Sequence, residues 1–164
     1  MGVCFQCINL YALTPTTVRR LSKSEVVDFI RANIDPDAVS SGGNWVDIPV
    51  GAGQERIFFS QCKPSSASKG HWSYDFFHTI AVERIGEIAA NGATIVLINY
   101  LDKKFSVLDG EDIVWLCVYS VRNKSNEGVV CDIVVEKDDN GDFFLRPYDR
   151  IRSERRKIEV KKFD

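Results

Sequence analysis

The sequence predicts an α+β fold, in which a mixed, largely antiparallel sheet carries two flanking helices. Two segments show apolar residues at helical spacing, and each is bounded by a capping or stopping signal. Several short apolar or alternating runs, separated by turn residues, lie around them and are typical of strands. At 164 residues, the chain has the length of one domain with a buried core.

The first helix is expected over residues 23–34. Ser22 and Glu25 make a capping box, in which the serine accepts from a backbone N–H and the glutamate reaches back. Pro36 disfavours helical backbone at the residue before it and so ends the helix. The apolar residues between these signals recur at helical spacing: Val26, Val27, Ile30 and Ile34.

Strands are expected on both sides of this helix. Residues 3–13 are mostly apolar and aromatic. Residues 45–50 and 56–63 flank a glycine-containing turn and predict a hairpin, with Pro49 indicating an edge or an end. Residues 71–77 alternate aromatic and polar side chains, which is also typical of a strand.

The second helix is expected to begin at a Thr79 cap and to end at Asn91-Gly92, because glycine tolerates the left-handed conformation found there. Residues 93–101 then contain a continuous apolar run, which is typical of a central strand buried on both faces. Residues 105–108 predict a further strand. The buried stripe of the helix is Ile80, Ile85 and Ile88.

Residues 109–121 fit two alternatives, a short capped helix or another strand. Residues 129–136 and 143–146 are joined by Asp-Asp-Asn-Gly and predict a second hairpin. We expect residues 1–146 to form a single domain and residues 147–164 to be a basic tail or linker.

The charge is unevenly divided along the chain. The stretch from residue 146 to the C-terminus has eight basic and four acidic residues, a net charge of +4, against −6 for the rest. One reading is a tail whose Arg152, Arg155 and Arg156 contact phosphates. The other is a solvated helix face, or a linker to another domain.

Five cysteines without a regular disulfide framework, and no stretch near the ~20 apolar residues of a membrane span, favour a reducing cytoplasm. Cys117 and Cys131 lie in apolar runs and are expected in the core. Cys62 with His78 stays open as a nucleophile pair. Cys4 and Cys7 have the spacing of zinc ligands, but the second pair of ligands that a zinc site needs does not follow.

One constellation in the first hairpin carries the catalytic hypothesis. Asp47 lies on its first strand, and Gln61 and Lys63 lie near the end of the second, two residues apart on one face. Asp47 and Gln61 can hold Mg²⁺, which activates water, while Lys63 stabilises the transition state. Glu25 can supply another carboxylate ligand if the first helix packs beside the hairpin.

This region resembles the restriction-endonuclease-like nucleases of the PD-(D/E)xK superfamily, especially their Mrr-type branch. The matching residues are Trp45-Val46-Asp47-Ile48 and Ile57 to Lys63, followed by the helix from Thr79 and the strand from Gly92. The resemblance implies a catalytic core of Asp47, Gln61 and Lys63. It also implies a Mg²⁺-dependent DNA-cleaving, or nuclease-derived, domain of a restriction or anti-phage system. In this chain glutamine replaces the commoner glutamate before Lys63.

Two other function classes compete with a nuclease. Lys69, His71, Trp72 and Tyr74 combine cations with aromatic rings that stack on bases, which indicates a noncatalytic DNA-binding specificity module. The alternative for this segment is that its aromatic side chains are core. A third class is an interaction protein without a catalytic centre. DNA is the expected partner, no membrane is expected, and the oligomeric state is open and includes a homodimer.

Overall fold

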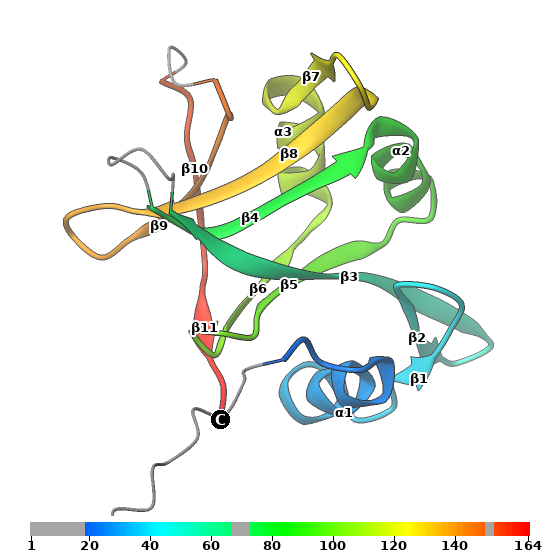
Figure 1. Cartoon of the computed structure of the whole chain (residues 1–164). Coiled ribbons are helices and arrows are strands. Elements are labelled where there is room, and N and C mark those ends of the chain that lie inside the picture. Colours follow the sequence, from blue (N-terminus) through cyan, green and yellow to red (C-terminus); the bar gives the residue numbers. More distant parts are fainter. Residues whose placement is uncertain (1–18, 67–72, 150–152) are drawn as a thin grey trace, which may run out of the picture.

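The computed structural model describes residues 19–66, 73–149 and 153–164, and within them the chain has the expected α+β architecture (Figure 1). Its helices and strands follow one another as α1 (Lys23–Asn33), β1 (Val39–Ser40), β2 (Trp45–Val50), β3 (Gly53–Ser66), β4 (Ser73–Ala81), α2 (Val82–Ala90), β5 (Thr94–Asn99), β6 (Lys104–Leu108), α3 (Gly110–Tyr119), β7 (Val121–Lys124), β8 (Gly128–Lys137), β9 (Phe143–Arg146), β10 (Arg156–Ile158) and β11 (Lys161–Lys162).

The sheet is mixed and largely antiparallel, as predicted, with the order β10-β9-β8-β4-β3-β5-β6-β11. The parallel pair is β3 with β5. Both edges of this order come from one short segment, because β10 pairs with β9 and β11 pairs with β6. Residues 156–162 therefore connect the two edges (Figure 1), so the expectation of a tail or linker is wrong for this part of the chain, which contributes two strands to the sheet.

Strand β3 changes its partner at Lys63. Residues 57–62 pair with β5, whereas Lys63, Ser65 and Ser66 pair with β4, with a register shift between Lys63 and Ser65. Strand β4 then continues along β8. Strands β3 and β4 consequently diverge on the N-terminal side of Lys63 (Figure 1). Residues 19–22 run beside β3 at this point, where Arg20 and Leu21 bond to Gln61.

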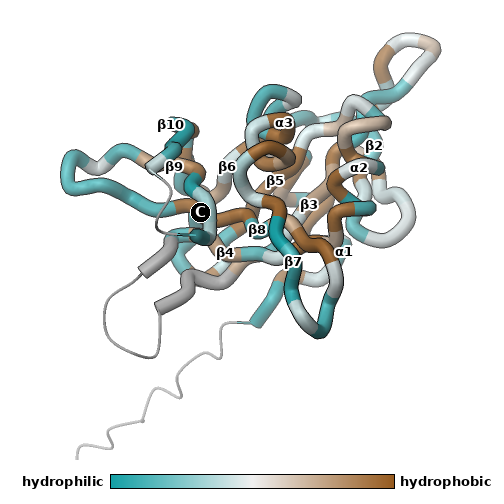
Figure 2. The backbone as a smooth tube through the Cα atoms, turned by 90° about the horizontal axis from the view of Figure 1, so that it is seen from above, coloured by the Kyte–Doolittle hydropathy of each residue, from teal (hydrophilic) through white to brown (hydrophobic). Residues whose placement is uncertain are grey.

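Two apolar clusters lie on opposite faces of β3 and β5, and the brown segments of Figure 2 mark them along the backbone. The first contains Phe58, Ile95 and Leu97 with residues of α2, α3, β4 and β8. The second contains Phe59, Val96 and Ile98 with α1. Strand β5 is therefore buried on both faces, which confirms the expectation from its continuous apolar run.

Helix α1 begins where the sequence predicts. Ser22 accepts a hydrogen bond from the Glu25 N–H, and the Glu25 carboxylate accepts from the Ser22 N–H at 2.7 Å. The capping box is thus complete, and it satisfies two of the free N–H groups of the first turn. Val26 and Ile30 are fully buried against the second cluster.

Helix α2 begins two residues later than expected. Thr79 and Ile80 belong to β4, and the N-cap is Ala81, which makes no side-chain hydrogen bond. The reason is tertiary: β4 pairs with β8 through Ala81, and the Thr79 hydroxyl donates to Asp132 at 2.6 Å rather than capping a helix. The predicted stop is confirmed, with φ of +59° at Gly92.

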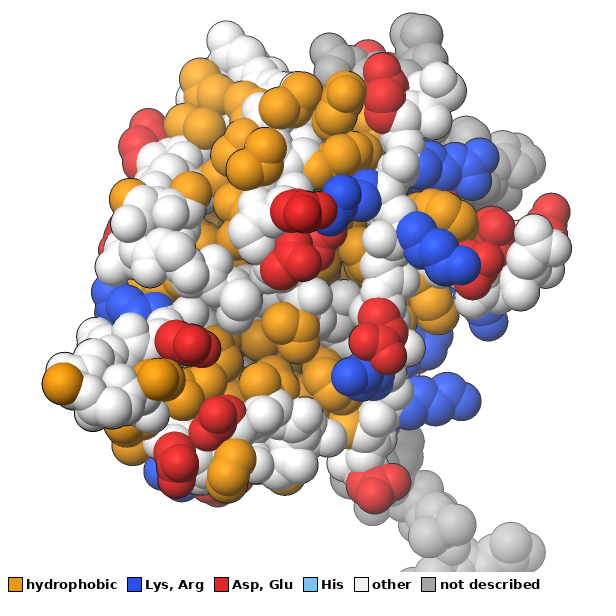
Figure 3. Space-filling model, turned by 180° about the vertical axis from the view of Figure 1, so that it is seen from behind, with side chains coloured by type: hydrophobic (Ala, Val, Ile, Leu, Met, Phe, Trp, Pro, Cys, Tyr) orange, Lys and Arg blue, Asp and Glu red, His pale blue; other side chains and the backbone are white. Residues whose placement is uncertain are grey.

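For the ambiguous residues 109–121 the helix alternative is confirmed, since α3 is capped by Asp109 and runs to Tyr119. The alternative of a strand from Val114 to Val121 is wrong, because β7 begins only at Val121. This gives the sheet a third helix. Val114 and Val118 on its outer side are 62% and 60% exposed, and Figure 3 shows hydrophobic side chains over α3. Cys117 is exposed, so the core assignment was wrong for this residue, whereas Cys131 is buried as expected.

The strand expected over residues 3–13 lies outside the described residues. No helix in the described ranges is long and apolar enough to cross a membrane.

Candidate functional site

Asp47 has a structural partner on the neighbouring strand. It stands opposite Arg56 in the β2–β3 register, and its carboxylate accepts a hydrogen bond from the Arg56 Nε at 3.0 Å. The guanidinium of Arg56 also lies 4.4 Å from the centre of the Trp45 ring and donates to the Asn91 side chain at 3.3 Å. Asp47 is thus part of an ion pair beside the first apolar cluster.

Gln61 faces the other side of the sheet. Side chains alternate along a strand, so Gln61 lies on the same face of β3 as Phe59, which packs in the second cluster against α1. Arg56 lies on the opposite face, with Phe58 of the first cluster. Gln61 lies five residues beyond the partner of Asp47, about 16 Å along the strand. The expectation that Asp47 and Gln61 converge is therefore wrong, because the hairpin register places them on opposite faces.

Lys63 is two residues beyond Gln61 on β3, and its main chain pairs with Phe77 of β4. Its side chain lies outside what the structure describes. Asp47, Gln61 and Glu25 do not come together as a metal site, since Asp47 lies across the sheet from the other two. In the described part of the chain, no group of three His, Cys, Asp or Glu residues is placed to hold a metal ion.

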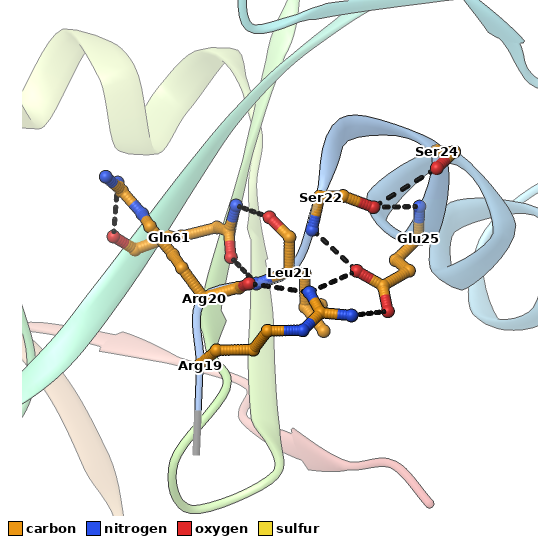
Figure 4. A network of polar contacts seen from close by, with 7 residues as sticks. All are labelled: Arg19, Arg20, Leu21, Ser22, Ser24, Glu25 and Gln61. Atoms are coloured by element: carbon orange, nitrogen blue, oxygen red, sulfur yellow. Dashed lines mark hydrogen bonds and ion pairs between the residues drawn. The ribbon is translucent and has the colours of Figure 1, made fainter. Parts of the chain in front are cut away.

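Glu25 is held by its own neighbours (Figure 4). Its two carboxylate oxygens accept from the Arg19 guanidinium at 2.6 and 2.7 Å, and one also accepts from the Ser22 N–H. The Arg19 hydrogen bond, followed by those from Ser22, lowers the pKa of Glu25 to about 2. Glu25 therefore stays ionised at neutral pH and is already neutralised by Arg19.

A hollow of about 240 Å³ opens beside Gln61, at the N-terminus of α1. Two cations line it. Arg20 donates to the Gln61 carbonyl oxygen at 3.2 Å, and Lys23 donates to the carbonyl oxygens of Gly43, at 2.6 Å, and Ser41. We call this hollow the Arg20–Lys23 pocket, and its lining residues are Arg20, Lys23, Gly43, Asn44, Phe59 and Gln61.

The side chain of Gln61 joins β3 to the segment that precedes α1 (Figure 4). Its Oε1 accepts from the Leu21 N–H and its Nε2 donates to the Leu21 carbonyl, both at 2.8 Å. These bonds fix residues 19–22 against β3, which places Arg20 and the start of α1.

The pair Cys62 and His78 flanks the Lys63–Phe77 pair on neighbouring strands. Burial, with smaller opposing contributions from Ser60 and Arg20, raises the pKa of the Cys62 thiol to about 12. Burial first, and Arg20 second, lower the pKa of His78. Because the thiol is 1% exposed and stays protonated, this pair lacks the accessible thiolate that nucleophilic chemistry needs.

The other expected nucleic-acid contacts fall into four groups. Arg156 is engaged with Asp112 at 2.5 Å and Glu111 at 3.0 Å, where it supports the start of α3. Arg155 is exposed and lies 5.8 Å from the Phe144 ring centre. Tyr74 is placed in β4 by its main chain alone. Lys69, His71, Trp72 and Arg152 lie outside the described residues.

No protein-family model, curated protein or solved structure gives a significant match to this chain. The site therefore has to be interpreted from its own geometry. Sequence reasoning missed Arg20 and Lys23, although two basic residues ending two positions before the serine of a capping box, and one directly after that serine, were visible. Cations that flank a helix N-terminus are a usable signal for an anion site.

Proposed function

We propose that the chain is a noncatalytic nucleic-acid-binding module that holds a backbone phosphate in the Arg20–Lys23 pocket. The observation that carries this proposal is that two cations, Arg20 and Lys23, line one hollow beside Gln61, and Lys23 is the first residue of α1. Backbone N–H groups and the dipole at a helix N-terminus favour anions, and cationic side chains strengthen that preference.

The charge balance of the pocket favours phosphate over a metal ion. Among the ion pairs of the described residues, none includes Arg20 or Lys23, and their hydrogen bonds go to neutral carbonyl groups. The nearby carboxylate of Glu25 is matched by Arg19. The pocket consequently keeps two positive charges, which repel Mg²⁺ and attract phosphate.

The size of the pocket favours one group of a longer molecule. Its volume of about 240 Å³ is below the roughly 300–1,000 Å³ typical of sites that enclose a whole small ligand. A further basic residue, Lys63, follows Gln61 by two residues along β3. A repeating polyanion therefore suits this surface better than a free phosphate compound.

The test is equilibrium binding of fluorescent oligonucleotides at low salt, followed by anisotropy. Arg20→Gln is compared with Arg31→Gln, which removes the same charge from the far end of α1 and likewise loses a bond to a carbonyl oxygen. We expect Arg20→Gln to weaken binding by about tenfold, the equivalent of one lost charged contact, while Arg31→Gln changes it little. Absence of binding by the unmodified chain, or equal losses in both variants, would overturn the proposal.

A Mg²⁺-dependent DNA-cleaving domain is the second candidate. The supporting observation is the order of Gln61 and Lys63 on β3, then α2, then a strand parallel to β3. Cleavage of mixed DNA substrates in Mg²⁺, compared with EDTA, separates the two candidates. A nuclease predicts cleavage in Mg²⁺ that Lys63→Ala abolishes. A binding module predicts that the DNA is bound and stays intact. An interaction protein predicts neither binding nor cleavage.

A further inference from the structure

An exposed aromatic ring lies under an arginine on the outer face of β4 and β8. The Arg122 guanidinium carbon is 4.4 Å from the centre of the Tyr148 ring. Tyr148 is 44% exposed, and the Phe77 ring lies 6.1 Å from it at an interplanar angle of 46°. Part of the Tyr148 ring is thus open to a flat partner, while Arg122 and Phe77 restrict its orientation.

Arg122 is fixed from below by a buried carboxylate. Asp132 is fully buried, and its two oxygens accept from the Thr79 hydroxyl at 2.6 Å and from the Arg122 Nε. A buried carboxylate persists only when it is paired and hydrogen-bonded, so this arrangement is strongly held. Tyr148 is therefore pre-organised, which reduces the entropy lost when a ligand stacks on it.

The Arg122–Tyr148 stack and the Arg20–Lys23 pocket lie on the same side of the sheet. Phe76, Ile80 and Ile133 point into the first apolar cluster, so the alternating residues Phe77, Thr79 and Asp132 point outward. Cys62 also belongs to the first cluster, so its neighbour Gln61 lies on the same side as Phe77, and the main chain of Phe77 pairs with Lys63, two residues from Gln61. The spacings within and between strands place Phe77 within roughly 10 Å of Gln61.

Three carboxylates on this side of the sheet are each paired with an arginine. Asp132 is paired with Arg122 and Glu136 with Arg146, and Glu25 is paired with Arg19. These carboxylates are neutralised by arginine, while Arg20 and Lys23 keep their charge.

We propose that the nucleic acid is single-stranded, with one phosphate in the Arg20–Lys23 pocket and an unpaired base stacked on Tyr148. This inference rests on the proposed function. Bases in a duplex are stacked on one another, so their faces are not available to a side-chain ring, whereas a single strand offers them. Tyr148 then selects single strands, and the pocket supplies affinity that does not depend on sequence.

The experiment measures the affinity of one oligonucleotide, as a single strand and as a duplex, for the full chain and two variants. Tyr148→Leu removes the ring, and Tyr148→Phe keeps it as the matched control. We expect Tyr148→Leu to weaken single-strand binding by about tenfold, as stacking on an aromatic side chain predicts. Duplex binding by Tyr148→Leu, and single-strand binding by Tyr148→Phe, stay within about twofold of the unmodified chain.

Each outcome separates this inference from the function on which it rests. If Arg20→Gln weakens binding and Tyr148→Leu does not, base stacking is wrong and phosphate binding stands. If Tyr148→Leu weakens the single strand and the duplex equally, strand selection is wrong. If the unmodified chain binds neither oligonucleotide, both proposals are wrong. Because Tyr148 is at the surface, circular dichroism is expected to show the same fold in all three proteins.

Discussion

The side chain of Gln61 forms two hydrogen bonds with the main chain of Leu21, 40 residues earlier in the chain, one accepted and one donated, each 2.8 Å long. An amide supplies both a donor and an acceptor, and here it acts as one more link of a β-ladder. Arg20 directly precedes Leu21 and Lys23 follows it by two residues, so the position of the pocket cations depends on this contact.

We predict that Gln61→Glu destabilises the fold. A carboxylate cannot donate to the Leu21 carbonyl, so two acceptors would face each other in a part-buried position. The free energy of unfolding is expected to fall by about 1–3 kcal/mol, measured by urea denaturation. Gln54→Glu, an exposed glutamine on the same strand, is the matched control. Equal stability of Gln61→Glu and the control would contradict the assigned role.

Asp47 is predicted to matter for stability and not for binding. Asp47→Ala removes an ion pair whose side chains are 18% and 24% exposed, so partial solvent screening limits its contribution to about 1 kcal/mol. Oligonucleotide affinity should remain at the level of the unmodified chain, since Asp47 lies on the face opposite Gln61. A large loss of affinity in folded Asp47→Ala protein would contradict the structure and favour the nuclease hypothesis.

His78 is predicted to make the fold less stable in mild acid. Burial and Arg20 lower its pKa in the folded chain, so the unfolded chain binds a proton more readily near the ordinary pKa of about 6.5. The stability contributed by neutral His78 is therefore present above that value and is lost as the pH falls toward the lower, folded pKa. Urea denaturation at about pH 7.5 and pH 5.5 should show a smaller loss for His78→Gln. If His78→Gln loses as much stability between these pH values as the unmodified chain, the effect comes from other titratable groups.

The strand after residue 155 is predicted to be part of the core. Ile158 is 9% exposed and packs in the first apolar cluster, so Ile158→Ala should lower the free energy of unfolding by about 2–4 kcal/mol. Val118→Ala, at an exposed position of α3, serves as the control and should change it by less than about 0.5 kcal/mol. If both variants lower the free energy of unfolding by a similar small amount, residues after 155 are a tail and not part of the core.

Local signals in the sequence predicted the elements that depend on neighbouring residues. The capping box of Ser22 and Glu25, the stop at Gly92 and the apolar run of β5 each use physics confined to a few residues. The pairing of residues 156–162 with both edges of the sheet involves strands far apart in sequence. Charge composition suggested a tail there, because alternating basic residues also suit the exposed side of a strand.

The predicted convergence of Asp47 and Gln61 was wrong for one identifiable reason. A two-residue turn between Val50 and Gly53 makes Asp47 pair with Arg56, and Gln61 is an odd number of residues from Arg56. Alternation along a strand then places Asp47 and Gln61 on opposite faces, so the turn length already contradicted their convergence. Arg20 could not be found in this way, because its contact with Gln61 spans 41 residues and depends on where β3 and β4 diverge.

The salt dependence of single-strand affinity tests phosphate binding in the Arg20–Lys23 pocket most directly. Each phosphate contact contributes a slope of about −0.7 to the logarithm of affinity against the logarithm of salt concentration. Arg20→Gln is expected to bind more weakly at low salt and with a slope shallower by about that amount, while Arg31→Gln keeps the slope of the unmodified chain. Identical slopes for all three proteins would show that Arg20 contacts no phosphate.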